Sequence, residues 1–116
     1  MGAPRFRPAS IFENCRDFGR NPGALPGPAP HLRPGQRAWA IYQHEVATSV
    51  LKDLRRRDLR INDLARQLGE DYDWLSRKLY GRVPADLGEM FEWALVLGIT
   101  VRPTLDEADI VRLPSV

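Results

Sequence analysis

Residues 61–99 read INDLARQLGEDYDWLSRKLYGRVPADLGEMFEWALVLGI and contain three helical patterns in succession. In each pattern apolar residues recur at intervals of three or four, and a glycine follows the last of them. Glycine adopts the left-handed backbone conformation that commonly ends a helix, so three helix C-termini are predicted, at Gly69, Gly81 and Gly98. Asp71 and Asp86 are placed to cap the N-termini of the second and third of these helices.

A longer amphipathic helix is predicted before this region, over residues 37–57. Its apolar residues are spaced by three or four positions and include Trp39, Tyr42, Val46, Val50 and Leu54. The arginines at 55–57 fall at its C-terminal end, where positive charge suits the helix dipole. We therefore expect an all-α domain of four or five helices. Trp93 is expected in its core, and Trp74 in the core or at an interface.

The N-terminal part of the chain has a different character. Residues 1–36 are rich in Pro and Gly, which interrupt helices, so an extended or disordered tail is expected there. Within this tail, residues 9–18 are compatible with a short helix capped by Ser10, with Ile11, Phe12 and Phe18 on its apolar face. Such a segment could dock on the domain or on a partner.

The C-terminal part is expected to contain short strands. Residues 99–102 and 110–113 each carry β-branched residues shortly before a proline, which is typical of a strand that ends there. We divide the chain into an N-terminal extension (1–36), a helical domain (37–103) and a C-terminal tail (104–116).

Charge is unevenly distributed along the chain although the net charge is only +2. Residues 1–36 contain five Arg against two acidic residues, and residues 37–60 contain six basic against three acidic residues. Residues 61–98 contain four basic against seven acidic residues. The basic front half favours an anionic partner, while the acidic region predicts only modest nonspecific affinity for nucleic acid.

Several functional classes are not indicated. Cys15 is the only cysteine, so neither an internal disulfide nor a thiolate zinc site is expected. The sequence has no apolar run of signal-peptide or membrane-span length, and a cytoplasmic location without membrane contact is expected. Catalytic motifs are absent, and His31 and His44 lie in separate segments, so we expect no enzyme, no cofactor and no metal site. His44 is expected at the surface or beside a polar neighbour.

Three sequence blocks together resemble a known family of DNA-binding proteins. The blocks are Leu64-Ala65-x-x-Leu68-Gly69, Leu75-Ser76-Arg77-Lys78-Leu79-x-Gly81-Arg82 and Phe91-x-x-Ala94-x-x-Leu97-Gly98-Ile99. Their order and spacing resemble the helix-turn-helix domain of the lambda-repressor and Cro-like family, of the xenobiotic-response-element type. The small residue Ala65 would let the first two helices approach closely, and Gly69 would form the turn between them.

The resemblance implies that residues 71–80 form a recognition helix in the major groove of DNA. Tyr72, Asp73, Ser76 and Arg77 match positions that face base edges in the family, and Arg77 suits a bidentate contact to guanine. The positions implied to contact phosphates are Arg60, Lys78 and Arg82. The chain is then a sequence-specific binder of double-stranded DNA, such as a small prokaryotic or phage-type transcriptional regulator or repressor.

Family members commonly bind DNA as dimers, so a homodimer is expected. The predicted strand at 99–102 could pair across that dimer, or it could form an internal hairpin with 110–113. A basic arm is a further hypothesis, in which Arg5, Arg7, Arg16, Arg20 and Arg33 follow the DNA.

An acidic turn departs from the DNA-binding pattern. Glu70, Asp71 and Asp73 lie at the edge that would approach phosphates. The alternative is an antitoxin-like or adaptor module with reduced DNA binding. It would hold a protein partner through the fourth helix, the C-terminal strand or the N-terminal tail.

Overall fold

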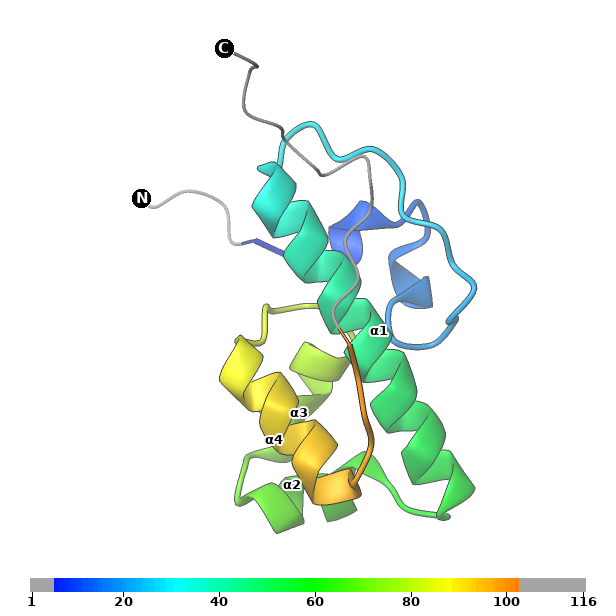
Figure 1. Ribbon diagram of the computed structural model, residues 1–116, viewed down its shortest axis with the longest axis vertical. Coiled ribbons are helices and arrows are strands. Elements are labelled where there is room, and N and C mark those ends of the chain that lie inside the picture. Colours follow the sequence, from blue (N-terminus) through cyan, green and yellow to red (C-terminus); the bar gives the residue numbers. More distant parts are fainter. Residues whose placement is uncertain (1–5, 103–116) are drawn as a thin grey trace.

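The computed structural model describes residues 6–102, which form four α-helices and two one-turn 3-10 helices (Figure 1). In chain order these are η1 (Pro8–Ile11), η2 (Cys15–Asp17), α1 (Pro34–Arg56), α2 (Ile61–Leu68), α3 (Tyr72–Leu79) and α4 (Leu87–Leu97). The expected all-helical class is confirmed. No strand is present among the described residues: the one expected at 99–102 is irregular chain, and 110–113 lies outside the described part.

The helix ends follow the local signals in the sequence. Gly69 and Gly98 take the left-handed conformation at the C-termini of α2 and α4, with φ of 67° and 66°. The side chains of Asp71 and Asp86 accept backbone N–H groups at the N-termini of α3 and α4. These four residues therefore cap the helices as predicted, because each signal acts within one turn of chain.

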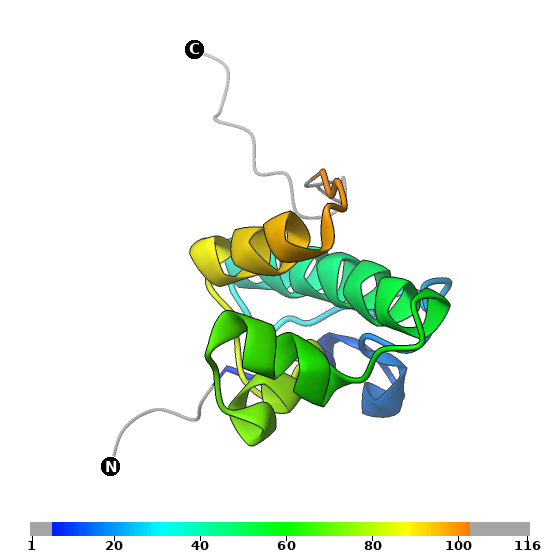
Figure 2. The same cartoon turned by 90° about the horizontal axis from the view of Figure 1, so that it is seen from below.

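The long helix α1 supports the other elements. It packs against α4, α3 and η1, and α2 packs against both α3 and α4. Figure 2 shows α1 and α4 in one layer, with α2 and α3 in a second layer below them. The interior contains mainly aliphatic side chains from all four helices: Val46, Val50, Leu54, Leu64, Leu75, Leu79, Met90 and Leu97. Trp93 is buried among them, as predicted.

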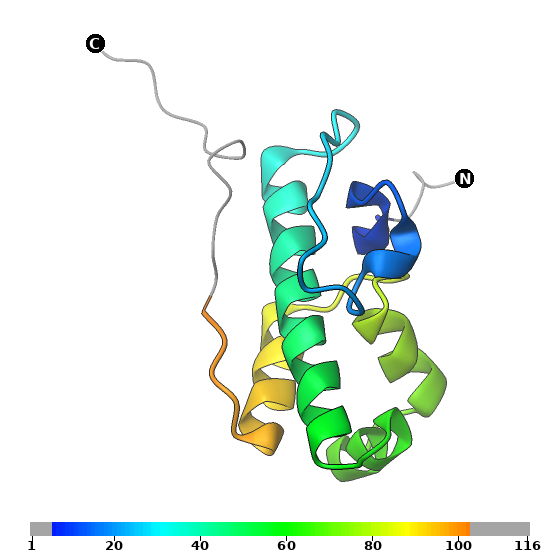
Figure 3. The same cartoon turned by 90° about the vertical axis from the view of Figure 1, so that its right-hand side faces the viewer.

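The N-terminal segment is not the extended tail that its composition suggested. Residues 8–32 lie against α1 on the same side as α3 (Figure 3). Ile11, Phe12 and Phe18 are buried in the same core cluster as the helices. The single helix expected over 9–18 is replaced by η1 and η2, and Ser10 is not its cap, because the Ser10 hydroxyl donates to the Arg7 carbonyl inside η1 at 2.7 Å.

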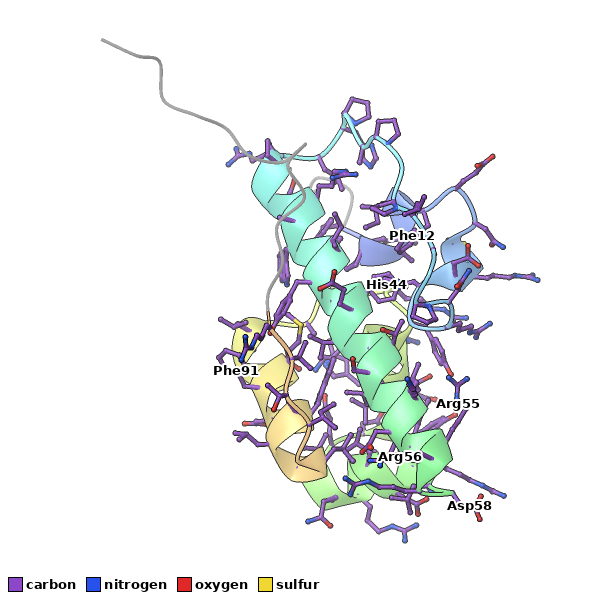
Figure 4. All side chains as sticks on the ribbon, turned by 45° about the vertical axis from the view of Figure 1, so that its right-hand side comes forward. Phe12, His44, Arg55, Arg56, Asp58 and Phe91 are labelled. Atoms are coloured by element: carbon purple, nitrogen blue, oxygen red, sulfur yellow. The ribbon has the colours of Figure 1, made fainter. Side chains whose placement is uncertain are left out.

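Two buried polar side chains of α1 attach neighbouring segments. Gln43 is fully buried and makes three hydrogen bonds to backbone groups between Lys78 and Ala85. The next residue, His44, is buried beside Phe12 (Figure 4), and its Nδ1 accepts the Gly19 N–H at 2.9 Å. The expected polar neighbour of His44 is therefore a backbone amide of the N-terminal segment.

Burial lowers the pKa of His44 below its ordinary value, and the Asn21 carbonyl and the Asp17 charge oppose this shift in part. The neutral imidazole is the form that can accept the Gly19 hydrogen bond.

No helix in the described part of the chain combines the length and the apolar character needed to cross a membrane.

Candidate nucleic-acid interface

The helix α3 buries one face and exposes the other. Leu75 and Leu79 are fully buried and attach α3 to α1 and α2. On the outer face, Tyr72 is 47% exposed and Trp74 is 43% exposed, and Asp73 and Arg77 are also exposed. Ser76 is half-buried beside them. The structure thus leaves the four residues expected to face bases accessible to solvent. Trp74 is not in the core, and Lys78 Nζ lies 5.2 Å from the centre of its ring.

Two of the three acidic side chains around the turn between α2 and α3 have hydrogen-bond partners in the domain. Glu70 accepts a hydrogen bond from Lys78 Nζ at 2.6 Å, and Asp71 accepts the Trp74 N–H at 3.0 Å. Only Asp73 among the three carboxylates of this region has no such bond within the described residues. Asp73 also lies in the first turn of α3, where negative charge suits the helix dipole.

Lys78 was expected to contact a phosphate, but its side chain is buried between two glutamates. Its side chain is only 5% exposed and pairs with Glu70 and with Glu89 of α4. Burial disfavours its charge, but the hydrogen bonds and charges of Glu70 and Glu89 outweigh burial, so the pKa of Lys78 is raised. Lys78 joins the end of α3 to α4, and reaching a DNA phosphate would mean leaving both carboxylates. We therefore leave it out of the interface.

Two pockets lie near the two ends of α3. At its N-terminal end, Arg60, Ile61, Asn62 and Tyr72 line a pocket of about 550 Å³, which brings together two residues expected to contact DNA. The N–H of Arg60 is fixed by Asp63 Oδ2 at 2.8 Å, so the start of α2 is held in place. Near the C-terminal end of α3, Arg77 and Arg82 line a second pocket.

The arginine cluster at the end of α1 divides into two groups. Arg56 and Arg57 both pair with the buried carboxylate of Asp53, and Arg57 also donates to the Leu97 carbonyl of α4. Arg57 therefore joins the end of α1 to α4, whereas Arg56 pairs within α1. Figure 4 shows Arg55 and Arg56 at the lower end of α1.

Arg55 lines a small cavity of about 190 Å³ together with Arg20 and Arg60. The Arg20 guanidinium lies 4.4 Å from the centre of the Tyr80 ring, at the end of α3. Arg20 belongs to the N-terminal segment, and only the basic-arm hypothesis pointed to it. Its position follows from the docking of that segment and has no local sequence signal.

No group of three or more His, Cys, Asp or Glu side chains suited to a metal is found within residues 6–102. Comparison with models of protein families, with characterised proteins and with solved structures finds no match. The candidate interface therefore consists of the exposed face of α3, which carries polar side chains, and of one arginine-lined pocket near each end of the helix.

Proposed function

We propose that this protein binds double-stranded DNA sequence-specifically and that α3 enters the major groove. The observation that carries this proposal is the outer face of α3, where Tyr72, Asp73, Ser76 and Arg77 are accessible between two arginine-lined pockets. In major-groove readers, side chains of one helix contact base edges while arginines around it hold phosphates.

The arrangement of α2 and α3 supports a helix-turn-helix of the lambda-repressor and Cro-like type. Two helices of eight residues each are in contact and are joined by residues 69–71, with Gly69 in the left-handed conformation. Ala65 is buried at their junction. A short turn containing glycine is typical of this motif. A role as a small transcriptional regulator is part of the same proposal.

Each residue of the interface has a proposed role. Arg77 donates two hydrogen bonds to guanine, Asp73 accepts from cytosine, and Ser76 contacts a neighbouring base. Tyr72 contacts a phosphate or a thymine methyl group, and Arg60 and Arg82 bind phosphates.

A gel-shift assay against genomic DNA fragments tests the proposal, at low and at moderate salt. The wild-type protein should shift a subset of fragments, and Arg77→Ala should weaken that binding by roughly 5- to 150-fold, the cost of about 1–3 kcal/mol for one bidentate base contact. Lys52→Ala removes one charge from the exposed side of α1 and should bind like the wild type. Absence of any shift, or equal binding by Arg77→Ala, would refute the proposal.

We further propose that the protein acts as a homodimer through α4. Leu87, Phe91 and Leu95 follow one another at four-residue spacing and are about half or more exposed. Figure 4 shows Phe91 on the side of α4 turned away from α1. An apolar row of this kind suits a two-fold contact in which the same residues face each other.

The mass in solution tests the dimer. Leu95 is 79% exposed, so Leu95→Glu leaves the core intact but places charge in the proposed contact. This variant should be monomeric at micromolar concentrations, whereas the wild type and Leu25→Glu, which changes a loop residue that is 87% exposed, should be dimeric. A monomeric wild type would contradict the dimer.

The same row on α4 supports the second candidate function, an adaptor or antitoxin-like module that holds a protein partner. Under that reading the wild-type protein is monomeric alone and shifts no DNA fragment. The two assays above therefore separate the two functions.

A further inference from the structure

One pocket in the structure is lined by three arginines from two distant parts of the chain. Arg7 comes from the residue before η1, while Arg77 and Arg82 come from the end of α3 and the loop after it. The pocket has a volume of about 560 Å³. Its other lining residues are Ala9, Ser10, Cys15, Gly81 and Val83. No carboxylate is among these lining residues, so the pocket has a strongly positive character.

Backbone hydrogen bonds fix Arg7 beside Arg82. The Arg7 carbonyl accepts both the N–H of Ser10 at 3.0 Å and its hydroxyl at 2.7 Å. Two residues after Arg7, the Ala9 N–H donates to the Gly81 carbonyl at 2.9 Å. Because Gly81 immediately precedes Arg82, this bond joins the two sides of the pocket. The backbone of Arg7 is therefore held at a defined place and does not lie on a free arm.

Three arginines and no carboxylate among the lining residues give this pocket an excess of positive charge, which an anion would balance. The planar guanidinium forms paired hydrogen bonds with phosphate oxygens, which makes phosphate the anion that such a set best accommodates. We propose that the pocket of Arg7, Arg77 and Arg82 binds a phosphate group of the DNA backbone, an inference that rests on the proposed DNA binding. The phosphate lies beside the base that Arg77 contacts, since Arg77 belongs to both sites.

This inference changes the role of the N-terminal segment. The basic-arm hypothesis treated its arginines as equivalent contacts along the DNA. In the structure Arg7 lines the pocket, whereas Arg16 is exposed on η2 outside it. Arg5 of that hypothesis lies outside the described residues. The segment is thus docked on the domain and supplies Arg7 to this pocket.

Salt dependence of DNA binding tests the pocket, with Arg7→Gln compared with Arg16→Gln. The two variants lose the same charge from the same segment. Affinity for a labelled duplex of about 25 base pairs is measured by fluorescence anisotropy between 50 and 300 mM KCl. Loss of one phosphate contact should reduce the slope of log K against log [KCl] by about 0.9 in Arg7→Gln. Arg16→Gln should keep the wild-type slope, and thermal unfolding checks that both variants are folded.

A second arm uses the protein without DNA. Inorganic pyrophosphate is titrated while the amide NMR signals of Gly81 and Arg82 are followed. These signals should shift in the wild type and in Arg16→Gln, and remain unchanged in Arg7→Gln. Equal salt slopes for the two variants, or pyrophosphate shifts that do not depend on Arg7, would overturn the pocket. Arg7-dependent pyrophosphate binding by a protein that binds no DNA would keep the pocket as a site for free phosphate and overturn the proposed function.

Discussion

Phe18 and Gly81 depend on each other for their positions. A Cβ atom built on Gly81 would lie 2.6 Å from the Phe18 ring, and Gly81 has a φ of 72° that side chains other than glycine rarely adopt. Phe18 is fully buried in this position. Only glycine at position 81 therefore lets the N-terminal segment close over the end of α3.

Substitution of Gly81 by Ala should destabilise the protein by roughly 2–5 kcal/mol. The left-handed conformation costs about 1–2 kcal/mol for alanine, and displacement of a packed ring adds about 1–3 kcal/mol. Gly69→Ala is the matched control, because Gly69 has nearly the same φ but open space around its Cβ position. It should lose only the conformational part. Urea unfolding measures both losses, and equal values would show that the contact with Phe18 is unimportant.

Gln43 satisfies three backbone groups with a single buried side chain. Its Nε2 donates to the carbonyls of Lys78 and Val83 at 2.7 and 3.1 Å, and its Oε1 accepts the Ala85 N–H at 2.8 Å. These bonds attach α1 to the loop between α3 and α4. Gln43 therefore fixes the orientation of α3, and with it the proposed interface.

The substitution Gln43→Leu should lower the free energy of unfolding by about 1–3 kcal/mol, because the buried Ala85 N–H would lose its partner, and an unsatisfied buried group costs about that much. Gln67→Leu makes the same change at an exposed position of α2 and should alter stability by less than about 0.5 kcal/mol. Urea unfolding with the same protocol compares the two. A loss below about 1 kcal/mol in Gln43→Leu would contradict this role.

Among the elements, the helices could be predicted from sequence, whereas for the N-terminal segment the sequence indicated an apolar face but not where it would dock. The ends of α2 and α4 depend on residues within one turn, such as Gly69 and Asp86, so the signal is local. Burial of Phe18 depends instead on the absence of a side chain at Gly81, far away in the sequence. The high proline and glycine content of the N-terminal segment predicted an extended tail. Composition does not show that the Phe18 ring fits against Gly81.

In the candidate interface, too, features set by local sequence could be predicted and contacts between different elements could not. Exposure of Arg77 follows from helical spacing, because Leu75 and Leu79 define the buried face of α3. The ion pair of Lys78 with Glu89 joins two different helices, and helical spacing alone gave no reason to expect it. The roles of the exposed residues in DNA binding remain predictions.

Docking of the N-terminal segment should depend on pH through His44. Because the pKa of His44 is lowered in the folded protein, protonation favours the unfolded state. Its contribution to stability is complete above the unfolded value of about 6.5 and is lost as the pH falls through the lower folded value. The other charged group acting on it, Asp17 of η2, favours protonation and limits the effect.

Hydrogen exchange of the Gly19 amide measures this docking, since that amide donates to His44 Nδ1. After correction for intrinsic exchange, protection of Gly19 should fall between pH 7 and pH 5, with amides of α2 changing less. The variant His31→Gln alters an exposed histidine and should leave this dependence unchanged. Constant protection across that range would show that His44 does not control docking.

At the scale of the whole molecule, the fold redistributes charge that looks segregated in the sequence. Asp53 neutralises part of the arginine cluster of α1, and Lys78 is paired with two glutamates. Arg7 and Arg20 of the N-terminal segment instead line cavities around the end of α3. The net charge of +2 therefore does not reveal that both of these arginines lie near the end of α3.

Selection from a random duplex library tests the central claim, that the exposed face of α3 reads DNA sequence. The wild-type protein should enrich a defined motif that contains an invariant guanine. The variant Arg77→Ala should enrich the same motif with that guanine relaxed, while Lys52→Ala should enrich the wild-type motif. Enrichment of no motif by the wild type, or of an identical motif by Arg77→Ala, would contradict the account.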